Sequence, residues 1–437
     1  MLPPGPRSSL MSLYRYMRDP MLCLTPLARE YGDPFTFPGK TPLVCTGDPA
    51  GIKAIYTADA DTFAPLNEDF AVFLGKNQLL LQSGAEHRRA RKAMMPPFHG
   101  ARMRAYGEAM CRITEDVIAA WAPEQVVSVQ EIAQRISLDV ILQAIFGIRD
   151  ATRMAELAKL LLDIVEGISP LIVMLPALRR EFGGIGPFSR FRKRQARLHA
   201  ELDALAEEAR AAGPREDILS LLLQVRYDDG EPMSDDELRE QLLVLVFAGH
   251  ETTAIAIAWA CYALHQPENS GALERLRDEL AAMGPEPEVE QLAKQPYLDA
   301  VCQETLRRFP LAPAPAPRKL LRPLEVLGYE LPEGVAVAAA IALAHFREET
   351  YPEPMRFRPE RFFERKFTPF EFLPFGGGAR RCLGAAMANY ELRLVLATLL
   401  RRYRLRLESL RPDQGKVRAA NVGPAHGVRM IVEERLA

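Results

Sequence analysis

A single cysteine, Cys382, closes a glycine-rich stretch whose residue types could support metal or redox chemistry. The stretch reads Phe375-Gly376-Gly377-Gly378-Ala379-Arg380-Arg381-Cys382-Leu383-Gly384. Glycines let the backbone approach a sulfur closely. Apolar residues at positions 392, 395, 396 and 399 predict a helix directly afterwards, and its positive N-terminal end favours a thiolate, the form that binds metals. A lone cysteine elsewhere is usually a small core residue.

The spacing around Cys382 excludes other common cysteine sites. No second cysteine lies nearby, which argues against zinc or an iron–sulfur cluster. Covalent haem attachment would need Cys-x-x-Cys-His, which is absent. The pattern Phe-x-x-Gly-x-Arg-x-Cys-x-Gly instead resembles the haem-binding loop of the cytochrome P-450 family. The resemblance implies that the Cys382 thiolate is the axial ligand of iron in haem b, and that Phe375, Arg380 and Gly384 contact the haem.

A second motif, Ala248-Gly249-His250-Glu251-Thr252-Thr253, lies within a long apolar pattern. Gly249 weakens a helix, and the Thr252 hydroxyl can bond the Ala248 carbonyl, so the helix could open for dioxygen or water. Alone, Glu251 is equally well explained as a buried carboxylate satisfied by an arginine. Beside the cysteine loop, the run resembles the family's acid–alcohol pair. That implies proton relay by Glu251 and a hydrogen bond from Thr252 to dioxygen.

Glu304-x-x-Arg307 places opposite charges on one helix face, which is worth only about 0.2–0.5 kcal/mol on a surface helix. Phe357-Arg358-Pro359-Glu360-Arg361-Phe362 follows some fifty positions later. Together these runs resemble the family's Glu–Arg pair and its second arginine segment. The resemblance implies a buried triad of Glu304, Arg307 and Arg361 that holds the cysteine loop in place.

Basic residues at several places are candidates to bind the haem propionates, because arginine bonds carboxylates bidentately. His87 and Arg91 are four apart on a predicted basic helix over 86–93, hence on one face. The resemblance adds Arg318 and Arg380. The other basic residues are open to two interpretations, a solvated face or a docking patch for an acidic electron carrier. They are Arg88, Arg89 and Lys92, with Arg381 as a further candidate.

Substrate contacts follow from the resemblance alone. It implies a pocket roof from 70–81 and 155–200, and walls from 243–252, 311–315 and 421–424. The residues expected to line this pocket are Phe73, Leu80, Val244, Phe247, Ala248, Leu311, Ala312 and Val422. Their mostly apolar character favours a lipophilic substrate such as a fatty acid, terpenoid, steroid or macrolide. Each is equally explained as ordinary core.

The elements that must position these residues are mainly helical. Ser234-x-x-Glu237 is a capping box, and no proline follows before Pro267, which predicts a helix over 234–266. Its middle, 242–264, is apolar nearly all round and should be buried. A hairpin is predicted at 35–45, a helix from 49, and strands at 325–329, 335–340, 403–407 and 429–432. We expect the mainly α cytochrome P-450 fold, with small β-sheets and a long central helix, as one domain over 1–437.

Composition bounds the partners and the compartment. The 437 residues are 48% hydrophobic and 26% charged, as in a globular protein, and a formal charge of -2 implies no nucleic-acid partner. Six cysteines without a spacing pattern fit a reducing compartment. The N-terminus shows no signal peptide, and the apolar stretch 168–178 is too short to span a bilayer. We expect a cytoplasmic, bacterial protein without a membrane span.

The four motifs occur in family order and the resemblance covers nearly the whole chain. They predict a haem-thiolate monooxygenase that inserts one oxygen atom of O2 into a lipophilic molecule by hydroxylation or epoxidation. No flavin or iron–sulfur region is visible, so NAD(P)H electrons should arrive through a ferredoxin or flavodoxin with its reductase. The alternatives are a haem-thiolate peroxygenase or isomerase, against which Glu251 and Thr252 argue, and a non-catalytic haem-binding sensor, which needs no proton relay.

Overall fold

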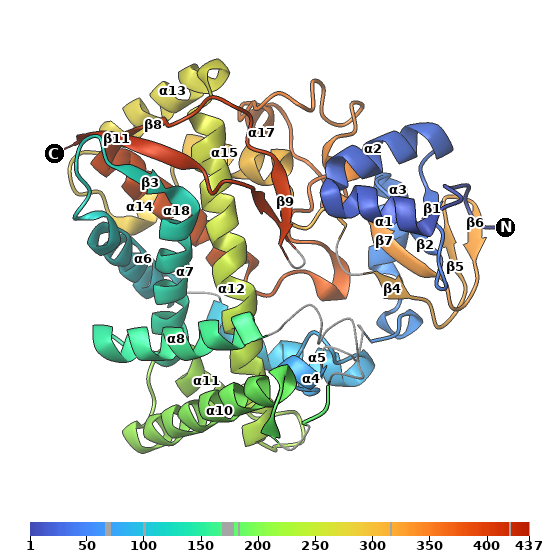
Figure 1. The fold of residues 1–437 in the computed structure, drawn as a ribbon, viewed down its shortest axis with the longest axis horizontal. Helices are drawn as coiled ribbons and strands as arrows, with labels where there is room; N and C mark the ends of the chain where they lie inside the picture. The colour runs from blue at the N-terminus through green and yellow to red at the C-terminus, as the bar shows by residue number, and fades with distance from the viewer. Residues whose placement is uncertain are drawn as a thin grey trace. The chain divides into compact units, whose positions relative to one another are not determined.

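The computed structural model describes residues 1–65, 71–98, 102–167, 179–181, 184–314, 317–418 and 421–436. The chain divides into two compact units, one of residues 1–66, 103–137 and 251–437, the other of 67–102 and 138–250. Helices dominate both, and the small sheets lie in the first unit (Figure 1), which confirms the mainly α fold class. One domain over 1–437 stays a prediction.

A four-stranded sheet with the order β1-β2-β7-β4 lies in the first unit. β1 (Phe35–Phe37) and β2 (Leu43–Thr46) form the predicted hairpin. β7 (Ala336–Ala339) pairs with β2 in parallel, and β4 (Arg318–Lys319) pairs with β7 antiparallel. Alternate β7 side chains face opposite ways, as strand geometry requires. Those on one face share a core with α3 (Pro49–Thr57), and those on the other with α2 (Pro20–Tyr31).

The sequence predicts one strand over 325–329, and this prediction is wrong. The segment is a hairpin of β5 (Leu324–Val326) and β6 (Tyr329–Leu331). Its turn is formed by Leu327 and Gly328, whose φ angles are +51° and +80°. Two left-handed residues make the tight turn that suits a hairpin. Leucine is rarely found in that conformation, so the local sequence conceals the turn.

The rest of the first unit is built around α18 (Ala385–Arg402), the helix predicted after Cys382. Leu392, Val395, Leu396 and Leu399 are all buried, as their spacing predicts. Three helices pack against it: α13 (Ser270–Ala281), α14 (Val289–Ala293) and α15 (Pro296–Arg308). α18 continues into a three-stranded sheet in which β11 lies between β3 and β8. The strands are β3 (Val126–Ser128), β8 (Tyr403–Leu407) and β11 (Arg429–Arg435).

One helix, α12 (Asp235–Leu264), begins in the second unit and ends in the first. The Ser234 hydroxyl accepts the Glu237 N–H at 3.2 Å, but the Glu237 carboxylate accepts the Tyr227 hydroxyl at 2.5 Å. Residues 247–252 are exposed or half-buried. The prediction that all of 242–264 is buried is therefore wrong for this stretch. Its glycine and polar side chains interrupt the apolar surface there. Among the described helices α12 alone has the length and apolarity to cross a membrane, and 61% of its most apolar window is buried, as in a core helix.

The second unit contains short helices around α10 (Pro187–Ala212), which packs on α8 (Ala151–Gly167) and α11 (Ile218–Gln224). α4 (Ala71–Leu74) and α5 (Gly84–Met94) precede them in the chain. The loop after α4 is attached to α12 by two hydrogen bonds. Glu240 accepts the Asn77 N–H at 2.5 Å, and Gln241 accepts the Leu79 N–H at 3.0 Å. Of the predicted pocket roof, residues 70, 168–178 and 182–183 lie outside the described residues.

The remaining elements connect these parts. They are α1 (Ser9–Arg18), η1 (Ala60–Thr62), η3 (Pro96–Phe98), α6 (Arg102–Ile118), α7 (Val129–Phe146), η6 (Pro267–Asn269), α16 (Ile341–His345), α17 (Arg361–Glu364), η7 (Gly378–Arg380), β9 (Gly415–Arg418) and β10 (Asn421–Pro424).

Candidate functional site

Cys382 lies between η7 and α18, and its side chain is exposed. The Cys382 N–H donates to the Phe375 carbonyl at 2.9 Å, which closes the loop. The Ala388 N–H donates to the Gly384 carbonyl at 2.9 Å and starts α18. The sulfur therefore sits just ahead of an 18-residue helix, where the positive end of the helix dipole favours the thiolate.

The other five cysteines lack this accessibility. Burial raises the pKa of the Cys23 thiol to about 11 and that of Cys261 to about 12. Cys45 and Cys302 are also buried, Cys111 is half-buried, and burial raises the pKa of each. All six cysteines lie in described parts of the chain, and Cys382 is the exposed one. It is therefore the one cysteine that can act as an accessible thiolate.

The cysteine loop packs closely on Tyr56 of α3. Gly376 and Gly378 have φ angles of +66° and +61°, which favour glycine. A Cβ on Gly377 would lie 2.4 Å from the Tyr56 ring, and one on Gly378 would lie 2.3 Å from the Tyr56 carbonyl oxygen. A Cβ on Gly384 would meet nothing within 4 Å. Two of the glycines thus permit close packing on α3, while the space beside Gly384 is open.

Arg318 of β4 contacts the same tyrosine. Its guanidinium lies 5.4 Å from the Tyr56 ring centroid and 5.2 Å from that of Phe63. Burial lowers the pKa of Arg318, and in the described part of the chain this side chain forms neither a hydrogen bond nor an ion pair. A half-buried cation without a carboxylate is unfavourable, so the position suits an anionic ligand. An anionic macrocycle bound through Cys382 fits this donor set.

The other predicted propionate ligands are less well defined. Arg380 is half-buried in η7 of the first unit. His87 is buried and Arg91 half-buried, both on α5 of the second unit. Their shared contact with one haem stays a prediction.

Acidic partners neutralise part of the basic surface of α5. Arg89 pairs with Asp229 at 3.0 Å and lies 3.8 Å above the Tyr227 ring. Lys92 pairs with Asp228 at 2.6 Å. Both aspartates belong to a turn in which the Gly230 N–H donates to the Tyr227 carbonyl at 2.9 Å. The surface is therefore less positive than the sequence of α5 alone indicates.

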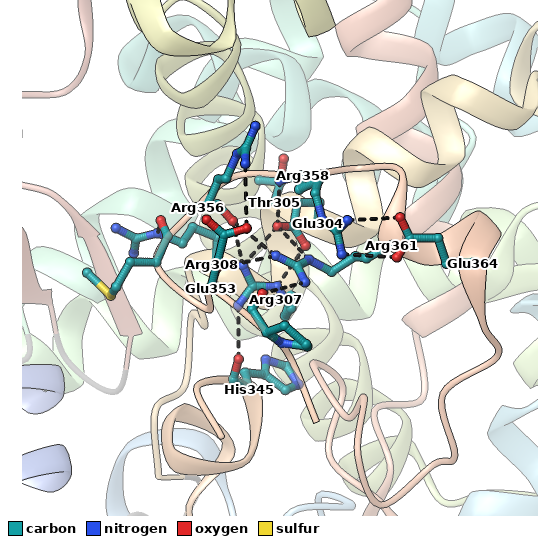
Figure 2. Close-up of polar contacts among 12 residues, drawn as sticks. Glu304, Thr305, Arg307, Arg308, His345, Glu353, Arg356, Arg358, Arg361 and Glu364 are labelled. Carbon is teal, nitrogen blue, oxygen red and sulfur yellow. Dashed lines mark hydrogen bonds and ion pairs between the residues drawn. The ribbon is translucent and has the colours of Figure 1, made fainter. Parts of the chain in front are cut away.

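Glu304, Arg307 and Arg361 contact one another inside the first unit (Figure 2). Arg307 donates to Glu304 twice, from Nε at 2.7 Å and from Nη2 at 2.8 Å, and Arg361 Nε donates at 3.1 Å. Glu304 and Arg307 are 0% exposed and Arg361 is 2% exposed. Two guanidiniums and one carboxylate leave one excess positive charge. Backbone carbonyls compensate for it, since Arg361 also donates to Pro352 at 3.2 Å.

Two aromatic or heteroaromatic residues that the sequence did not single out connect this triad with the segment ahead of the cysteine loop. His345 accepts Arg307 Nη1 through its carbonyl at 2.9 Å, and its ring Nε2 accepts the Leu373 N–H at 3.1 Å. The Tyr351 ring lies 5.2 Å below the Arg307 guanidinium, and its hydroxyl donates to the Glu371 carbonyl at 3.1 Å. His345 carried a signal, as a lone polar side chain in the apolar run 335–346.

Glu251 and Thr252 are half-buried on α12. Among the described residues of its own unit, no arginine or lysine forms an ion pair with Glu251. A Cβ on Gly249 would lie 3.1 Å from Ile141 Cδ1, so this glycine permits close packing in the second unit. The roles of Glu251 and Thr252 in proton delivery stay predictions.

The predicted pocket residues are divided between the units. In the first, Leu311, Ala312 and Val422 are half-buried, and the Val422 N–H donates to the Leu311 carbonyl at 2.8 Å. The others are in the second unit: Phe73 and Val244 are buried, whereas Leu80, Phe247 and Ala248 are exposed. The Phe73 ring packs edge-on against the Phe191 ring, with ring centroids 5.5 Å apart, as in a hydrophobic core.

A cavity of about 490 Å³ opens in the second unit beside α4 and α10. Its charged lining comprises Arg179, Glu181, Arg192 and Glu240. Arg192 lies 3.7 Å from Glu181. The Arg179 guanidinium lies 5.7 Å from the ring of Phe73, a predicted pocket residue. Two arginines and two glutamates therefore line this cavity together with apolar residues.

Known proteins resemble this chain along its length. The family profile described as Cytochrome P450 matches residues 2–420. A Mycobacterium bovis protein with the provisional name cytochrome P450 135B1 is 35% identical over 445 residues, which cover 99% of this chain and 91% of that protein. Mycobacterium tuberculosis cytochrome P450 135A1, also provisionally named, is 34% identical over 454 residues, which cover 100% of this chain and 96% of that protein. The solved structure of retinoic acid-bound cyanobacterial CYP120A1 matches with a TM-score of 0.85 at 27% identity, over 100% of both chains.

Proposed function

This chain is a member of the cytochrome P450 family, and we propose that it is a haem-thiolate monooxygenase acting on a lipophilic carboxylic acid. Haem-thiolate monooxygenase activity is general to the family. The observation that carries it to particular residues is the loop at Cys382, an exposed cysteine ahead of α18 in a loop packed on Tyr56. Haem, when bound, supplies the iron chemistry that activates dioxygen.

The residues of the first unit suit the binding of such a group. Cys382 would hold the iron as a thiolate, and Arg318 would balance a propionate, because its cation has no carboxylate partner among the described residues. Tyr56 contacts both the cysteine loop and Arg318, so it would fix the position of the sulfur relative to the cation.

We assign proton delivery to Glu251 and Thr252. Glu251 is half-buried and is not held in an ion pair within its unit, so it can exchange protons with water and pass them inward. The Thr252 hydroxyl is one residue away on α12 and can both donate and accept. The Thr252→Ala variant should consume NADPH while forming less hydroxylated product. Unchanged product yield per NADPH would favour the peroxygenase or isomerase alternative.

Electrons would come from NAD(P)H through a ferredoxin or flavodoxin with its reductase. Support comes from the predicted docking residues Arg88 and Lys92, which are exposed on α5 and lie beside Met95 and Pro96. Complementary charge raises the rate of encounter with an acidic carrier.

The substrate class rests on two observations. The matching cyanobacterial structure contains retinoic acid, a lipophilic carboxylic acid. In this chain, Arg179 and Arg192 line the cavity of the second unit, and the Arg179 guanidinium lies 5.7 Å from the Phe73 ring centroid. Glu181 and Glu240 line the same cavity, so the carboxylic acid class rests chiefly on the ligand of the cyanobacterial structure. We therefore expect a fatty acid or a terpenoid acid rather than an uncharged steroid or macrolide.

An optical titration of the purified protein tests both parts of this proposal. Retinoic acid and palmitic acid are compared with their methyl esters, which keep the apolar chain and lose the charge, and with a steroid and a macrolide. We expect a low-spin to high-spin Soret shift, with the acids binding at least about tenfold more tightly than the esters, a difference of about 1.4 kcal/mol. Equal response to acid and ester would reject the acid class. Absence of a haem band even after reconstitution, or a Cys382→Ala variant with an unchanged thiolate-type spectrum, would reject the haem-thiolate assignment.

A further inference from the structure

We propose that His345 is a positioning residue for Cys382. Through its imidazole Nε2, His345 connects the triad with the segment that leads into the cysteine loop. The inference rests on the proposed function, because the position of the sulfur matters only if it binds iron. It goes beyond the triad itself by naming the atom through which the triad reaches the loop.

His345 forms one hydrogen bond with the triad and one with the segment ahead of the cysteine loop. Its backbone carbonyl accepts Arg307 Nη1 at 2.9 Å, and its side-chain Nε2 accepts the Leu373 N–H at 3.1 Å (the His345–Arg307 contact is drawn in Figure 2). The side chain is 0% exposed, so water does not compete for either hydrogen bond. A single residue on α16 thus connects α15 with the segment that leads into the loop.

The contacts continue from Leu373 to the cysteine. The Leu373 carbonyl accepts the Gly376 N–H at 2.9 Å, and the Phe375 carbonyl accepts the Cys382 N–H at 2.9 Å. Leu373 is itself buried. A displacement of its backbone would therefore move Phe375 and, through it, the backbone of Cys382.

The chemistry of the ring favours this role over simple packing. Nε2 can accept only when the imidazole is neutral with its proton on Nδ1. Burial, assisted by the nearby charge of Arg307, lowers the pKa of His345 to about 3, which keeps the ring neutral. An interaction of the ring with the Arg307 backbone partly opposes this shift and suits a proton on Nδ1, which leaves Nε2 to accept. The ring also stacks on Phe372, with ring centroids 5.5 Å apart, so packing and hydrogen bonding have to be tested separately.

Three substitutions separate the acceptor from the ring. His345→Gln can present a carbonyl oxygen near the position of Nε2, His345→Asn presents one near Nδ1, and His345→Phe keeps the stacking without any acceptor. The holoenzyme is examined by its iron midpoint potential and by the spectrum of its ferrous carbon monoxide complex, with the thermal midpoint as the measure of stability. Hydrogen exchange of the peptide that contains the Leu373 amide is measured on the full chain.

We expect the Leu373 amide to exchange about tenfold faster in the Phe and Asn variants, and close to the wild-type rate in the Gln variant, since one buried hydrogen bond is lost or kept. The Phe and Asn variants should also show a more positive potential and a partly thiol-type spectrum. Equal exchange in all four proteins, or wild-type potential and spectrum in the Phe variant, would overturn the proposal. The exchange comparison needs no haem. A wild-type protein that binds no haem would therefore reject the proposed function, while the exchange rates would still decide whether His345 holds the Leu373 amide.

Discussion

Buried charge is the distinctive feature of this protein at the scale of single residues. Glu304 accepts hydrogen bonds from Arg307, from Arg361 and from the Arg358 N–H, the last at 2.8 Å. Such a cluster is costly to bury, and removal of one member leaves the others uncompensated. Its value for the protein is therefore positional, because it fixes α15, α17 and the chain between them.

Two neighbouring arginines allow this to be tested with a matched pair. Arg361→Ala removes a buried member of the triad and should lower the free energy of unfolding by about 3–5 kcal/mol. Arg358→Ala removes a guanidinium that forms a partly exposed pair with Glu364 at 2.9 Å and should cost less than about 1 kcal/mol. Urea denaturation of both variants checks this. Equal losses would mean that the triad is not the stabilising unit.

At the scale of elements, Glu391 of α18 is a buried carboxyl group that contacts Ser137 of α7. It is 3% exposed, and its hydrogen-bond partner is the Ser137 hydroxyl, which donates to its carboxyl. Burial raises its pKa to about 8 from an ordinary value of 4.5. Because the folded pKa lies above the unfolded one, Glu391 favours the folded state most below pH 4.5. This contribution falls as the pH rises to about 8, by up to about 1.4 kcal/mol per pH unit.

Replacement of Glu391 by glutamine should remove this pH dependence. Between pH 5 and pH 8 the variant should gain more than about 1 kcal/mol in unfolding free energy relative to wild type. Denaturation at the two pH values measures this. Glu349→Gln, whose side chain is 78% exposed, is the control and should show no such gain. A constant difference between the Glu391 variant and wild type would contradict the shifted ionisation.

The basic face of α5 makes a prediction about encounter with an electron carrier. Replacing Asp228 and Asp229 by asparagine removes two exposed ion pairs, each worth at most about 1 kcal/mol, so stability should hardly change. The surface becomes more positive, so reduction by an acidic ferredoxin should become several-fold faster at low ionic strength and lose that gain at high salt. Stopped-flow reduction measures this.

Asp116→Asn breaks a comparable exposed pair on α6, between Arg112 and Asp116 at 3.6 Å, and serves as the control. If all three proteins are reduced at the same rate over the whole salt range, the face of α5 is only solvated charge.

The long periodic elements could be predicted from sequence, and so could the types of residue at the site. Leu392, Val395 and Leu396 mark α18 because burial of one helix face imposes their spacing. Contacts between distant segments carry no such local signal. His345 meets Leu373 28 positions away, and Lys92 meets Asp228 136 positions away. The sequence predicted the helix that carries Lys92, but it did not indicate which segment this helix would touch.

At the scale of the whole molecule, the division into units falls within α12, between His250 and Glu251. The run 248–253 therefore spans the boundary, with Gly249 packed on Ile141 in the second unit. The site residues are correspondingly distributed. The triad, Cys382 and Arg318 belong to one unit, whereas His87, Arg91 and most predicted pocket residues belong to the other. The spacing of motifs along the chain does not predict which unit each site residue belongs to.

The turn at Leu327 has a consequence for protein engineering. Its φ of +51° is unfavourable for leucine, and asparagine or glycine would relax the backbone. The leucine side chain, however, covers Gly51 of α3, where an added Cβ would lie 2.9 Å from Leu327 Cδ1. α3 carries Tyr56, on which the cysteine loop rests. A stabilising substitution chosen from turn statistics would thus remove a packing contact from the helix that supports the cysteine loop. If that loop binds haem, the variant should gain melting temperature and retain its cofactor less well.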